Sequence, residues 1–375
     1  MSRIVVLHFS PLELYPPIQN FLRGLSASNT SKEIYVLTTQ TKLGALPKFT
    51  SDSEKIKIIR LGISAQKLNS FRRYSSYLFF YLGSIIFLLW KRPSAVLYYE
   101  TISSYPAYLY KRFFNSKARI FIHYHEYTST EEYSNGMKLN RYFHKHEKYL
   151  YPMAEWVSQT NEYRMQKFIK NLSSVTVANP RILPNYPPAN WHSLPDKKNS
   201  TPIKAVYIGA LSLDTMYVKE FSEWIMAQNG EIILDIYSYN IADTAKSFLR
   251  SLQSEWIILK EEVGYERLPQ LLKQYEVGVV LYKGHIDNYI FNAPNKLFEY
   301  LTIGLDVWFP NVMKGTLPYI TDKTYPKVIA VDFMQLEKFY IEEAIDKEGY
   351  TMSNNSYYSE QAFEPIITAL LINYN

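Results

Sequence analysis

Apolar runs rich in β-branched and aromatic residues alternate with amphipathic segments along the first half of the chain. The runs expected to form strands cover residues 3–9, 33–39, 55–63, 95–100, 119–126 and 156–161. The segments expected to form helices cover residues 14–25, 66–90, 103–113, 139–151 and 162–172. Continuous apolar strands that alternate with helices are typical of a parallel sheet covered on both faces. The pattern therefore predicts an α/β domain of the Rossmann type.

The alternation stops in a proline-rich segment, residues 176–204, and then resumes. The prolines of this segment include those at positions 180, 184, 187, 188 and 195. Beyond it, strands are expected over residues 204–211, 232–239, 256–261, 277–282 and 306–310, and helices over residues 216–227, 242–252 and 265–275. Because such a break marks a domain boundary, we expect two Rossmann-like domains, 1–185 and 186–355, whose parallel sheets face each other across a cleft. The final segment, 356–375, holds a helix over 360–374 that could pack back on the first domain.

The composition narrows the class of protein. The chain has 375 residues, of which 47% are hydrophobic, enough for two cores. It has no cysteine, which excludes disulfides, thiolate zinc sites and cysteine nucleophiles and fits a reducing compartment or indifference to redox. The apolar run at the N-terminus, Ile4–Phe9, is too short for a signal peptide. The formal net charge of +6 suits phosphate-bearing ligands or an anionic membrane, and without a long Lys/Arg tract we expect no nucleic-acid partner.

One segment raises the question of a membrane. Residues 74–90 are 17 residues without a charge, between Arg73 and Lys91. As a helix they would reach roughly 25 Å, short of the ~30 Å hydrocarbon core. The pattern favours a helix packed on a sheet, because an apolar strand follows it. A helix lying in a membrane interface and a true span stay open as alternatives.

A helix of unusual polarity is expected in "FNAPNKLFEYLTIGLDV", residues 291–307. Asn292 is a good N-cap, Pro294 suits a first turn, and Gly304 should lie just beyond the end. The N–H groups and the positive end of the helix dipole form an anion site, to which Lys296 adds a full charge.

Glu299 should share a helix face with Asn295 and Lys296, because it follows them by four and three residues. A carboxylate there can accept hydrogen bonds from the two hydroxyls of a ribose. The segment thus predicts a site for a nucleotide diphosphate. The alternative is a solvated pair of Lys296 and Glu299 with no function.

Other chemistries lack their motifs. His123 and His125 would share a strand face, and "HKHE" at 144–147 is a second histidine pair, but a zinc site needs three or four converging ligands. No Asp-x-Asp, Gly-x-Ser-x-Gly, Walker phosphate loop or G-x-G-x-x-G occurs in the sequence. We therefore expect no metal site and no cofactor.

The segment "NAPNKLFEYLTIGLDV" resembles the donor-binding helix of family 4 glycosyltransferases, which have the GT-B fold. Further segments are similar to that family: "EEVGYERLPQLLKQYEVGVVLY", "ILPNYPP" (182–188), "YIGALSLD" (207–214) and "FIHYHEYTS" (121–129). The resemblance is strongest over residues 262–310. The resemblance covers nearly the whole chain.

The resemblance implies roles for particular residues. Glu299 would bind the donor ribose, and the His125–Glu126 pair would reach the donor sugar or its leaving oxygen. The remaining residues implied in nucleotide binding are Gly209, Ser212, Tyr282, Asn295 and Lys296. The chain departs from the family where Phe291 replaces a second acid, where no basic residue precedes Lys219 in the loop after residue 208, and where no glycine pair follows the first strand.

The activity implied is transfer of a hexose-type sugar, with retention and without a metal, from a nucleotide donor to a hydroxyl acceptor. UDP is the expected nucleotide, from the family's commonest usage, and the acceptor would be a glycan or lipid-linked intermediate of surface polysaccharide synthesis. The protein would be cytoplasmic, with contact to the inner face of the membrane. Two alternatives are a nucleotide-sugar epimerase of similar shape and a non-catalytic sugar-nucleotide-binding or assembly protein.

Overall fold

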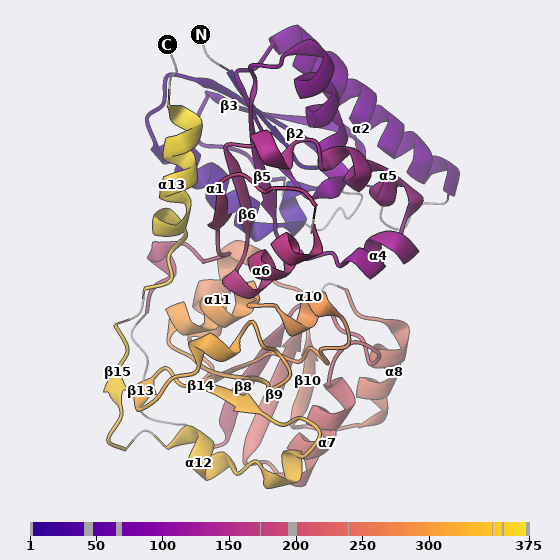
Figure 1. The fold of residues 1–375 in the computed structure, drawn as a ribbon. Coiled ribbons are helices and arrows are strands. Elements are labelled where there is room, and N and C mark those ends of the chain that lie inside the picture. The colour runs from indigo at the N-terminus through magenta and orange to yellow at the C-terminus, as the bar shows by residue number, and fades with distance from the viewer. Residues whose placement is uncertain are drawn as a thin grey trace. The chain divides into compact units, whose positions relative to one another are not determined.

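The computed structural model describes residues 3–40, 48–64, 70–172, 174–193, 201–238, 240–346, 348–354 and 356–372. Two compact units are formed: unit 1 is Met1–Asn185 together with Ser359–Asn375, and unit 2 is Tyr186–Tyr358 (Figure 1). Residues 194–200 of the proline-rich segment, with Pro195, lie outside the described residues.

Unit 1 is built on a sheet of seven parallel strands within the described residues, in the order β3-β2-β1-β4-β5-β6-β7. The strands are β1 (Arg3–Leu7), β2 (Glu33–Gln40), β3 (Ile56–Ile63), β4 (Ala95–Tyr99), β5 (Arg119–Tyr124), β6 (Trp156–Gln159) and β7 (Pro180–Ile182). The first six correspond to the expected runs, and β7 was not expected inside the proline-rich segment. The chain runs outward from β1 to β3 and then returns to the other side of β1 with β4. The order therefore reverses between β1 and β4, and ligands of open α/β sheets bind beyond the carboxyl ends at such a point.

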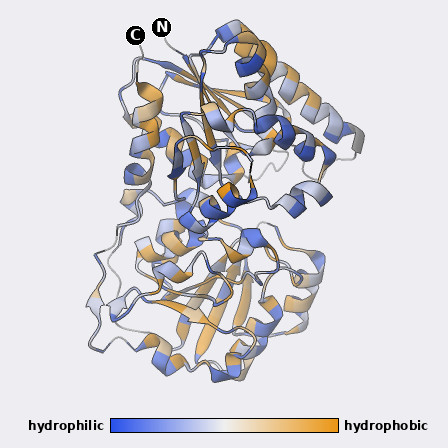
Figure 2. Ribbon diagram, in the orientation of Figure 1, coloured by the Kyte–Doolittle hydropathy of each residue, from blue (hydrophilic) through white to orange (hydrophobic). Residues whose placement is uncertain are grey.

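Helices cover both faces of this sheet. They are α1 (Pro16–Ala27), α2 (Ser70–Lys91), α3 (Ser104–Leu109) continued by a π-helical turn (Tyr110–Phe114), α4 (Thr130–Asn135), α5 (Lys138–Glu147), α6 (Glu162–Asn171) and α13 (Ser359–Leu371). Alternate residues of β1 enter two different cores: Val5 and Leu7 belong to one, Ile4 and Val6 to the other. This two-sided burial is why β1 is apolar at consecutive positions, and Figure 2 shows the strands of the sheet with mostly hydrophobic residues.

The C-terminal helix α13 packs against α1. The rings of Phe363 and Phe21 meet edge to face at 5.6 Å. The Arg119 guanidinium donates to the carbonyls of Ala369 and Leu370, both at 2.8 Å, so it satisfies groups that the end of α13 leaves free. The last helix thus belongs to the unit that begins with β1.

Unit 2 repeats the arrangement with six parallel strands within the described residues, in the order β10-β9-β8-β11-β12-β14. They are β8 (Ile203–Ile208), β9 (Ile232–Tyr237), β10 (Ile257–Lys260), β11 (Val277–Val279), β12 (Asp306–Pro310) and β14 (Val328–Val331); β13 (Thr324–Tyr325) and β15 (Thr351–Met352) pair separately. The order reverses between β8 and β11. The strands β13, β14 and β15 were not expected from the sequence pattern.

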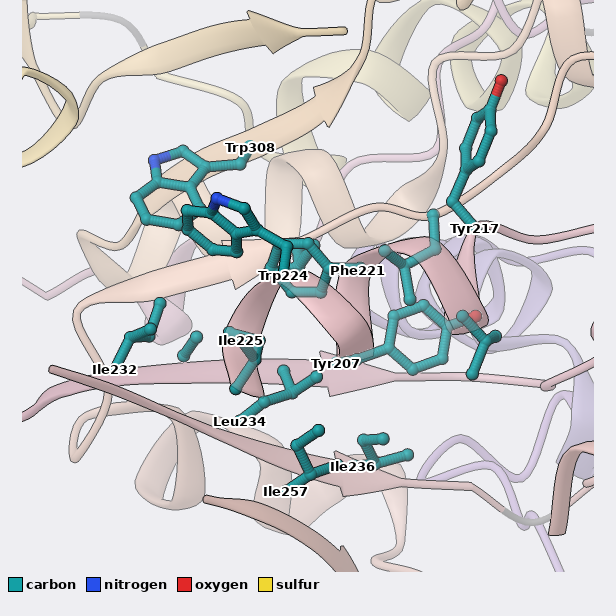
Figure 3. Close-up of a cluster of buried hydrophobic side chains, with 14 of the residues drawn as sticks. Tyr207, Tyr217, Phe221, Trp224, Ile225, Ile232, Leu234, Ile236, Ile257 and Trp308 are labelled. Carbon is teal, nitrogen blue, oxygen red and sulfur yellow. The ribbon is translucent and has the colours of Figure 1, made fainter. Parts of the chain in front are cut away.

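The helices of unit 2 are α7 (Val218–Ala227), α8 (Asp243–Ser251), α9 (Leu268–Leu272), α10 (Asp287–Ile290), α11 (Asn295–Ile303) and α12 (Ile341–Ile345). One core contains the α7 residues Phe221 and Trp224 and the β12 residue Trp308, whose ring lies 6.1 Å from that of Trp224 (Figure 3). The fold class is confirmed: both units are parallel-sheet, Rossmann-like α/β domains.

The expected helix over 66–90 is α2, with 22 residues. Among the described residues, no helix combines the length and the apolar character needed to cross a membrane. The side chains of Tyr77, Phe80, Tyr81, Phe87 and Leu88 are buried in the cores of unit 1. The expectation that this helix packs in a core is therefore confirmed for one of its faces.

Candidate functional sites at the carboxyl edges of the two sheets

Gly209 follows directly after β8, one of the two strands at the reversal point of unit 2. Its φ of +145° is a conformation that side-chain-bearing residues rarely adopt. Tyr282 follows the neighbouring strand β11, and its ring stacks on that of Tyr289 at 4.7 Å. These two positions were predicted to bind a nucleotide, and the fold brings them to one edge of the sheet.

Helix α11 runs from Asn295 to Ile303, and Gly304 is its C-cap with a φ of 98°, as predicted. The prediction that Asn292 caps this helix is wrong. Pro294 is in the N-cap position with an extended backbone, and no side chain caps the helix. Asn292 is held elsewhere, because its carbonyl accepts a hydrogen bond from Thr316 Oγ1 at 2.9 Å. No side chain that the structure describes therefore accepts a hydrogen bond from the backbone N–H groups in the first turn of α11 in the N-cap manner.

Lys296 reaches from the first turn of α11 to the end of β8. Its Nζ lies 4.9 Å from the ring centroid of Tyr207 and 5.3 Å from that of Tyr282. A Cβ atom on Gly209 would be only 2.6 Å from this Nζ. The two aromatic faces attract the ammonium, and the missing side chain at Gly209 leaves it room.

Glu299 lies one turn further along α11, and it is only 8% exposed. Among the described residues, none donates a hydrogen bond to its carboxylate or forms an ion pair with it. Burial raises the pKa of Glu299 to about 7, against the opposing effect of the Lys296 charge. The alternative of a solvated Lys296–Glu299 pair is therefore wrong for Glu299. A buried carboxylate without a donor is an acceptor suited to ligand hydroxyls.

The loop after β8 carries Ser212, whose Oγ accepts a hydrogen bond from the N–H of Asp214 at 3.2 Å. Lys283, which follows β11, was not predicted as a site residue. Its Nζ donates to the carbonyl of Leu213 at 3.0 Å and pairs with Glu220 at 3.0 Å. A basic residue just past an apolar run was the available signal. We call Gly209, Tyr282, Lys296 and Glu299 the edge site of unit 2.

His125 follows β5 in unit 1, and it is buried. Its ring stacks on Tyr99 at 5.0 Å, and its Nδ1 lies 3.2 Å from Asn185 Oδ1. Burial, followed by the charges of His123 and His8, lowers the pKa of His125 well below 6.5. Because an amide oxygen only accepts, Nδ1 carries the proton, and the buried Nε2 has no hydrogen-bond partner among the described residues. The ring is thus neutral with one nitrogen available as an acceptor.

Glu126, the next residue, is exposed and lies 3.6 Å from the guanidinium of Arg164. Arg164 itself is buried and donates to the carbonyl of His125 at 2.6 Å and to Thr160 Oγ1 at 2.9 Å. Arg164 therefore holds the backbone of His125 and also faces the carboxylate of Glu126.

Glu100 is a site residue that the sequence analysis missed. It follows β4, and its Oε1 accepts the N–H of His125 at 2.6 Å and that of Glu126 at 3.1 Å. Its backbone, with φ 62° and ψ 152°, lies in a region that is essentially reserved for glycine and costs about 1–3 kcal/mol. Burial, followed by the charge of Glu126, raises the pKa of Glu100 to about 8. An acid at the end of the apolar run 95–100 was the only signal in the sequence.

His8 follows β1, so it faces the same reversal point. Its Nδ1 donates to the carbonyl of Ser10 at 2.6 Å, and its ring centroid is 6.5 Å from that of His125. Burial lowers its pKa to about 4. We call His8, Glu100, His125 and Glu126 the edge site of unit 1.

The histidines considered as metal ligands, in the pairs His123/His125 and His144/His146, contact other side chains instead. The Nδ1 of His123 lies 2.8 Å from Ser158 Oγ, and the ring of His144 stacks on Tyr133 at 3.8 Å. Within the described part of the chain, His, Cys, Asp and Glu side chains do not gather in a group of three that could hold a metal ion.

Two cavities lie elsewhere. One of about 220 Å³ in unit 1 is walled by Tyr127, Tyr133 and Phe168 and by basic side chains of α5 and its C-cap: Arg141, His144, Lys145 and Lys148. The other, of about 260 Å³ in unit 2, contains none of the predicted site residues and has no carboxylate or ammonium in its lining. The larger cavity is therefore chemically unsuited to a diphosphate, and the smaller one suits an anion.

No protein-family model matches the sequence, and no curated protein matches it. Solved structures do match over nearly the whole chain. Sucrose-phosphate synthase from Thermosynechococcus elongatus has a TM-score of 0.65 at 13% identity and covers 99% of this chain and 95% of its own. The lipopolysaccharide outer core galactosyltransferase WaaB has a TM-score of 0.62 at 14% identity and covers 99% of both chains.

Anabaena Alr3699/HepE, in a complex with UDP and glucose, has a TM-score of 0.59 at 10% identity and covers 99% of this chain and 96% of its own. UDP-N-acetylglucosamine 2-epimerases also match, with TM-scores from 0.56 to 0.59. At these identities the likeness concerns the fold. Together with the two parallel sheets, these matches show that the chain has the GT-B fold.

Proposed function

We propose that this protein transfers a sugar from a nucleotide-sugar donor to a hydroxyl acceptor. The observation that carries the proposal is the edge site of unit 2. There a buried carboxylate without a donor, Glu299, lies one turn beyond a lysine that reaches the end of β8. Glu299 would accept the ribose hydroxyls, and Lys296 with the uncapped amino end of α11 would hold the diphosphate.

The chemistry asked of this site is electrostatic. When the bond between the sugar and the diphosphate breaks, negative charge grows on the phosphate oxygens. The Lys296 ammonium and the positive end of the α11 dipole stabilise that charge at fixed positions, which favours departure without a metal. Asn295 and Ser212 are positioned in the adjoining helix turn and loop, and we propose that they add polar contacts to the donor.

We propose that His125 and Glu126 act at the donor sugar or its leaving oxygen, as the resemblance to family 4 implies. The neutral ring of His125 supports this role, because it offers a nitrogen that can accept a hydrogen bond. Glu100 would be a positioning residue, since it holds the backbone of both. Membership of family 4 and retention of the anomeric configuration rest on the resemblance alone.

UDP is the proposed nucleotide, supported by the names of HepE in its UDP complex and of the UDP-N-acetylglucosamine 2-epimerases. The acceptor would be a glycan or a lipid-linked intermediate of surface polysaccharide synthesis, as the name of WaaB suggests. The basic, aromatic-walled cavity of unit 1 supports an acceptor that carries an anionic group.

Two alternative functions are an epimerase and a non-catalytic binding protein. An epimerase of the same fold would use the same nucleotide site. A non-catalytic binding protein is favoured by Phe291, which is buried at the position of the family's second acid.

Incubation of the full chain with a panel of UDP- and GDP-sugars, with and without simple glycosides as acceptors, separates these functions. Release of UDP or GDP that depends on Glu299 supports a transferase. A change of sugar configuration without net release supports an epimerase. Binding without turnover across the panel supports the non-catalytic protein and would contradict the proposal.

A further inference from the structure

The outward face of α2 carries large apolar side chains that the described part of unit 1 leaves exposed. Those more than half exposed, from 51% to 69%, are Tyr74, Leu78, Phe79, Leu82, Ile86 and Trp90. All but Phe79 stand four residues apart, so they form one continuous ridge along the helix. We call these six residues the α2 ridge. Figure 2 shows bands of hydrophobic residues on α2, interspersed with paler ones.

The opposite face of α2 already anchors the helix. Phe80 and Leu88 are fully buried there, and Tyr81 donates a hydrogen bond to the carbonyl of Ile102 at 2.9 Å. The helix is therefore apolar on both faces, and the core of unit 1 uses only one of them. An exposed apolar surface of this size is rare on proteins that stay free in water, and it marks an interaction surface.

A neighbouring segment extends the surface. The π-helical turn Tyr110–Phe114 contacts α2, and its Phe113 and Phe114 are 64% and 57% exposed. The same turn carries Lys111 and Arg112. Apolar and basic side chains are thus interleaved on this side of unit 1.

The segment that carries the α2 ridge is predominantly positive. Residues 70–119 include eight basic residues and a single acidic one, Glu100, although the whole chain has a formal net charge of only +6. Apart from Arg119, which is bonded to carbonyls at the end of α13, these basic residues are exposed or half-exposed: Arg72, Arg73, Lys91, Arg92, Lys111, Arg112 and Lys117. They stand at both ends of α2 and beside it, and Lys91 Nζ lies 3.7 Å from the ring of Trp90.

We propose that the α2 ridge docks on the surface of an anionic lipid bilayer, with α2 lying in the interface. A ridge of about 24 Å between Tyr74 and Trp90 presents enough apolar length for the headgroup–acyl boundary. The surrounding cations complement anionic headgroups, and Trp and Tyr are the aromatic residues that prefer this depth. A second copy of the chain is a poorer occupant, because a symmetric pair would bring two surfaces of the same positive charge together.

Flotation of the full chain with lipid vesicles tests the proposal. Vesicles of phosphatidylcholine mixed with phosphatidylglycerol should carry the protein upward at low salt, and vesicles of phosphatidylcholine alone should carry much less. Leu82→Ser with Ile86→Ser should weaken partition by at least about tenfold, and Arg72→Gln with Arg73→Gln and Arg92→Gln should remove the preference for anionic lipid.

The matched control is Ile320→Ser with Met334→Ser, which removes two exposed apolar side chains from unit 2 and should leave flotation unchanged. Circular dichroism checks that all variants fold. Equal flotation of the Leu82/Ile86 variant and the control would overturn the proposal. So would a dimer of the unmodified protein, seen by sedimentation without vesicles, that the Leu82/Ile86 variant dissociates and that does not float.

Discussion

The ammonium of Lys296 occupies the space that a side chain on Gly209 would need. A Cβ atom there would lie 2.6 Å from Nζ, much closer than two such atoms can approach. The glycine after β8 thus serves two purposes, a backbone with φ of +145° and room for a cation that comes from α11. This relationship links the end of a strand to the first turn of a helix far along the chain, and it can be tested from both sides.

Gly209→Ala should displace the Lys296 ammonium and strain the turn after β8. We expect affinity for UDP to fall by roughly tenfold or more, since a lost charge-assisted contact is worth about 1.5–3 kcal/mol. Isothermal titration calorimetry measures this change. Gly264→Ala is the matched control, because a Cβ there meets nothing within 4 Å and its φ is −65°. Equal affinities for both variants would contradict the arrangement.

Lys296→Ala should discriminate between ligands. If Nζ faces the diphosphate, affinity for UDP should fall by about 1.5–3 kcal/mol, while affinity for uridine should change little. Calorimetry with both ligands gives the comparison, and Lys273→Ala, an exposed lysine of the same unit, is the control. Equal losses for UDP and uridine would remove Lys296 from the phosphate role.

Glu299→Ala should weaken the binding of both UDP and uridine, because both carry the ribose. The expected loss is about 1.5–3 kcal/mol, provided that both hydroxyls bond to a charged carboxylate. Glu223→Ala on α7, whose side chain is 58% exposed, serves as the control. If 2′,3′-dideoxyuridine diphosphate were weakened by Glu299→Ala as strongly as UDP, the carboxylate would not be the ribose acceptor.

The pH dependence of nucleotide binding should follow Glu299. Burial raises its pKa from 4.5 to about 7, so the carboxyl gains a proton as the pH falls below 7 and loses the charge that accepts the hydroxyls. Affinity should decrease toward acid by up to about tenfold per pH unit below 7 and level off above it. The effect on stability runs the other way. Because the folded state binds this proton more tightly than the unfolded state, the contribution of Glu299 to the free energy of unfolding becomes more favourable as the pH falls from about 7 toward 4.5. Calorimetry with uridine, which has no group that titrates between pH 5 and 8, measures the pH dependence of binding, and Glu299→Gln should flatten the profile and leave weaker, constant affinity.

Glu100→Gln should slow turnover without changing nucleotide affinity. The Glu100 carboxylate accepts the N–H groups of His125 and Glu126, and an amide in its place can turn a donor toward them. We expect kcat to fall by at least about tenfold, because a small displacement of a catalytic group is costly. The Kd of UDP, bound in unit 2, should stay the same. Glu131→Gln, at an exposed position of α4, is the control, and a loss of UDP affinity in Glu100→Gln would contradict a positioning role.

The alternation of apolar and amphipathic segments was enough to predict both parallel sheets. The central strands, such as β1 and β4, are buried on two faces, so their apolar character is continuous and can be read locally. Gly304 could be predicted as a C-cap for the same kind of reason, because a left-handed backbone after a helix favours glycine wherever it occurs. The N-cap prediction at Asn292 failed because the helix starts only at Asn295, which leaves Pro294 in the N-cap position.

Residue spacing also placed Lys296 and Glu299 on one helix face, since helical periodicity depends only on position along the chain. The burial and the contacts of these two side chains could not be predicted from spacing. The burial of Glu299 and the contact of Lys296 with Gly209 depend on which segments the fold packs around them. Glu100 was missed for the same reason, because its bonds to His125 and Glu126 form only when β4 and β5 become neighbours. Local pattern therefore determined the elements and their faces, whereas the positions of charges, orphaned acceptors and exposed ridges followed only from the packing of distant segments.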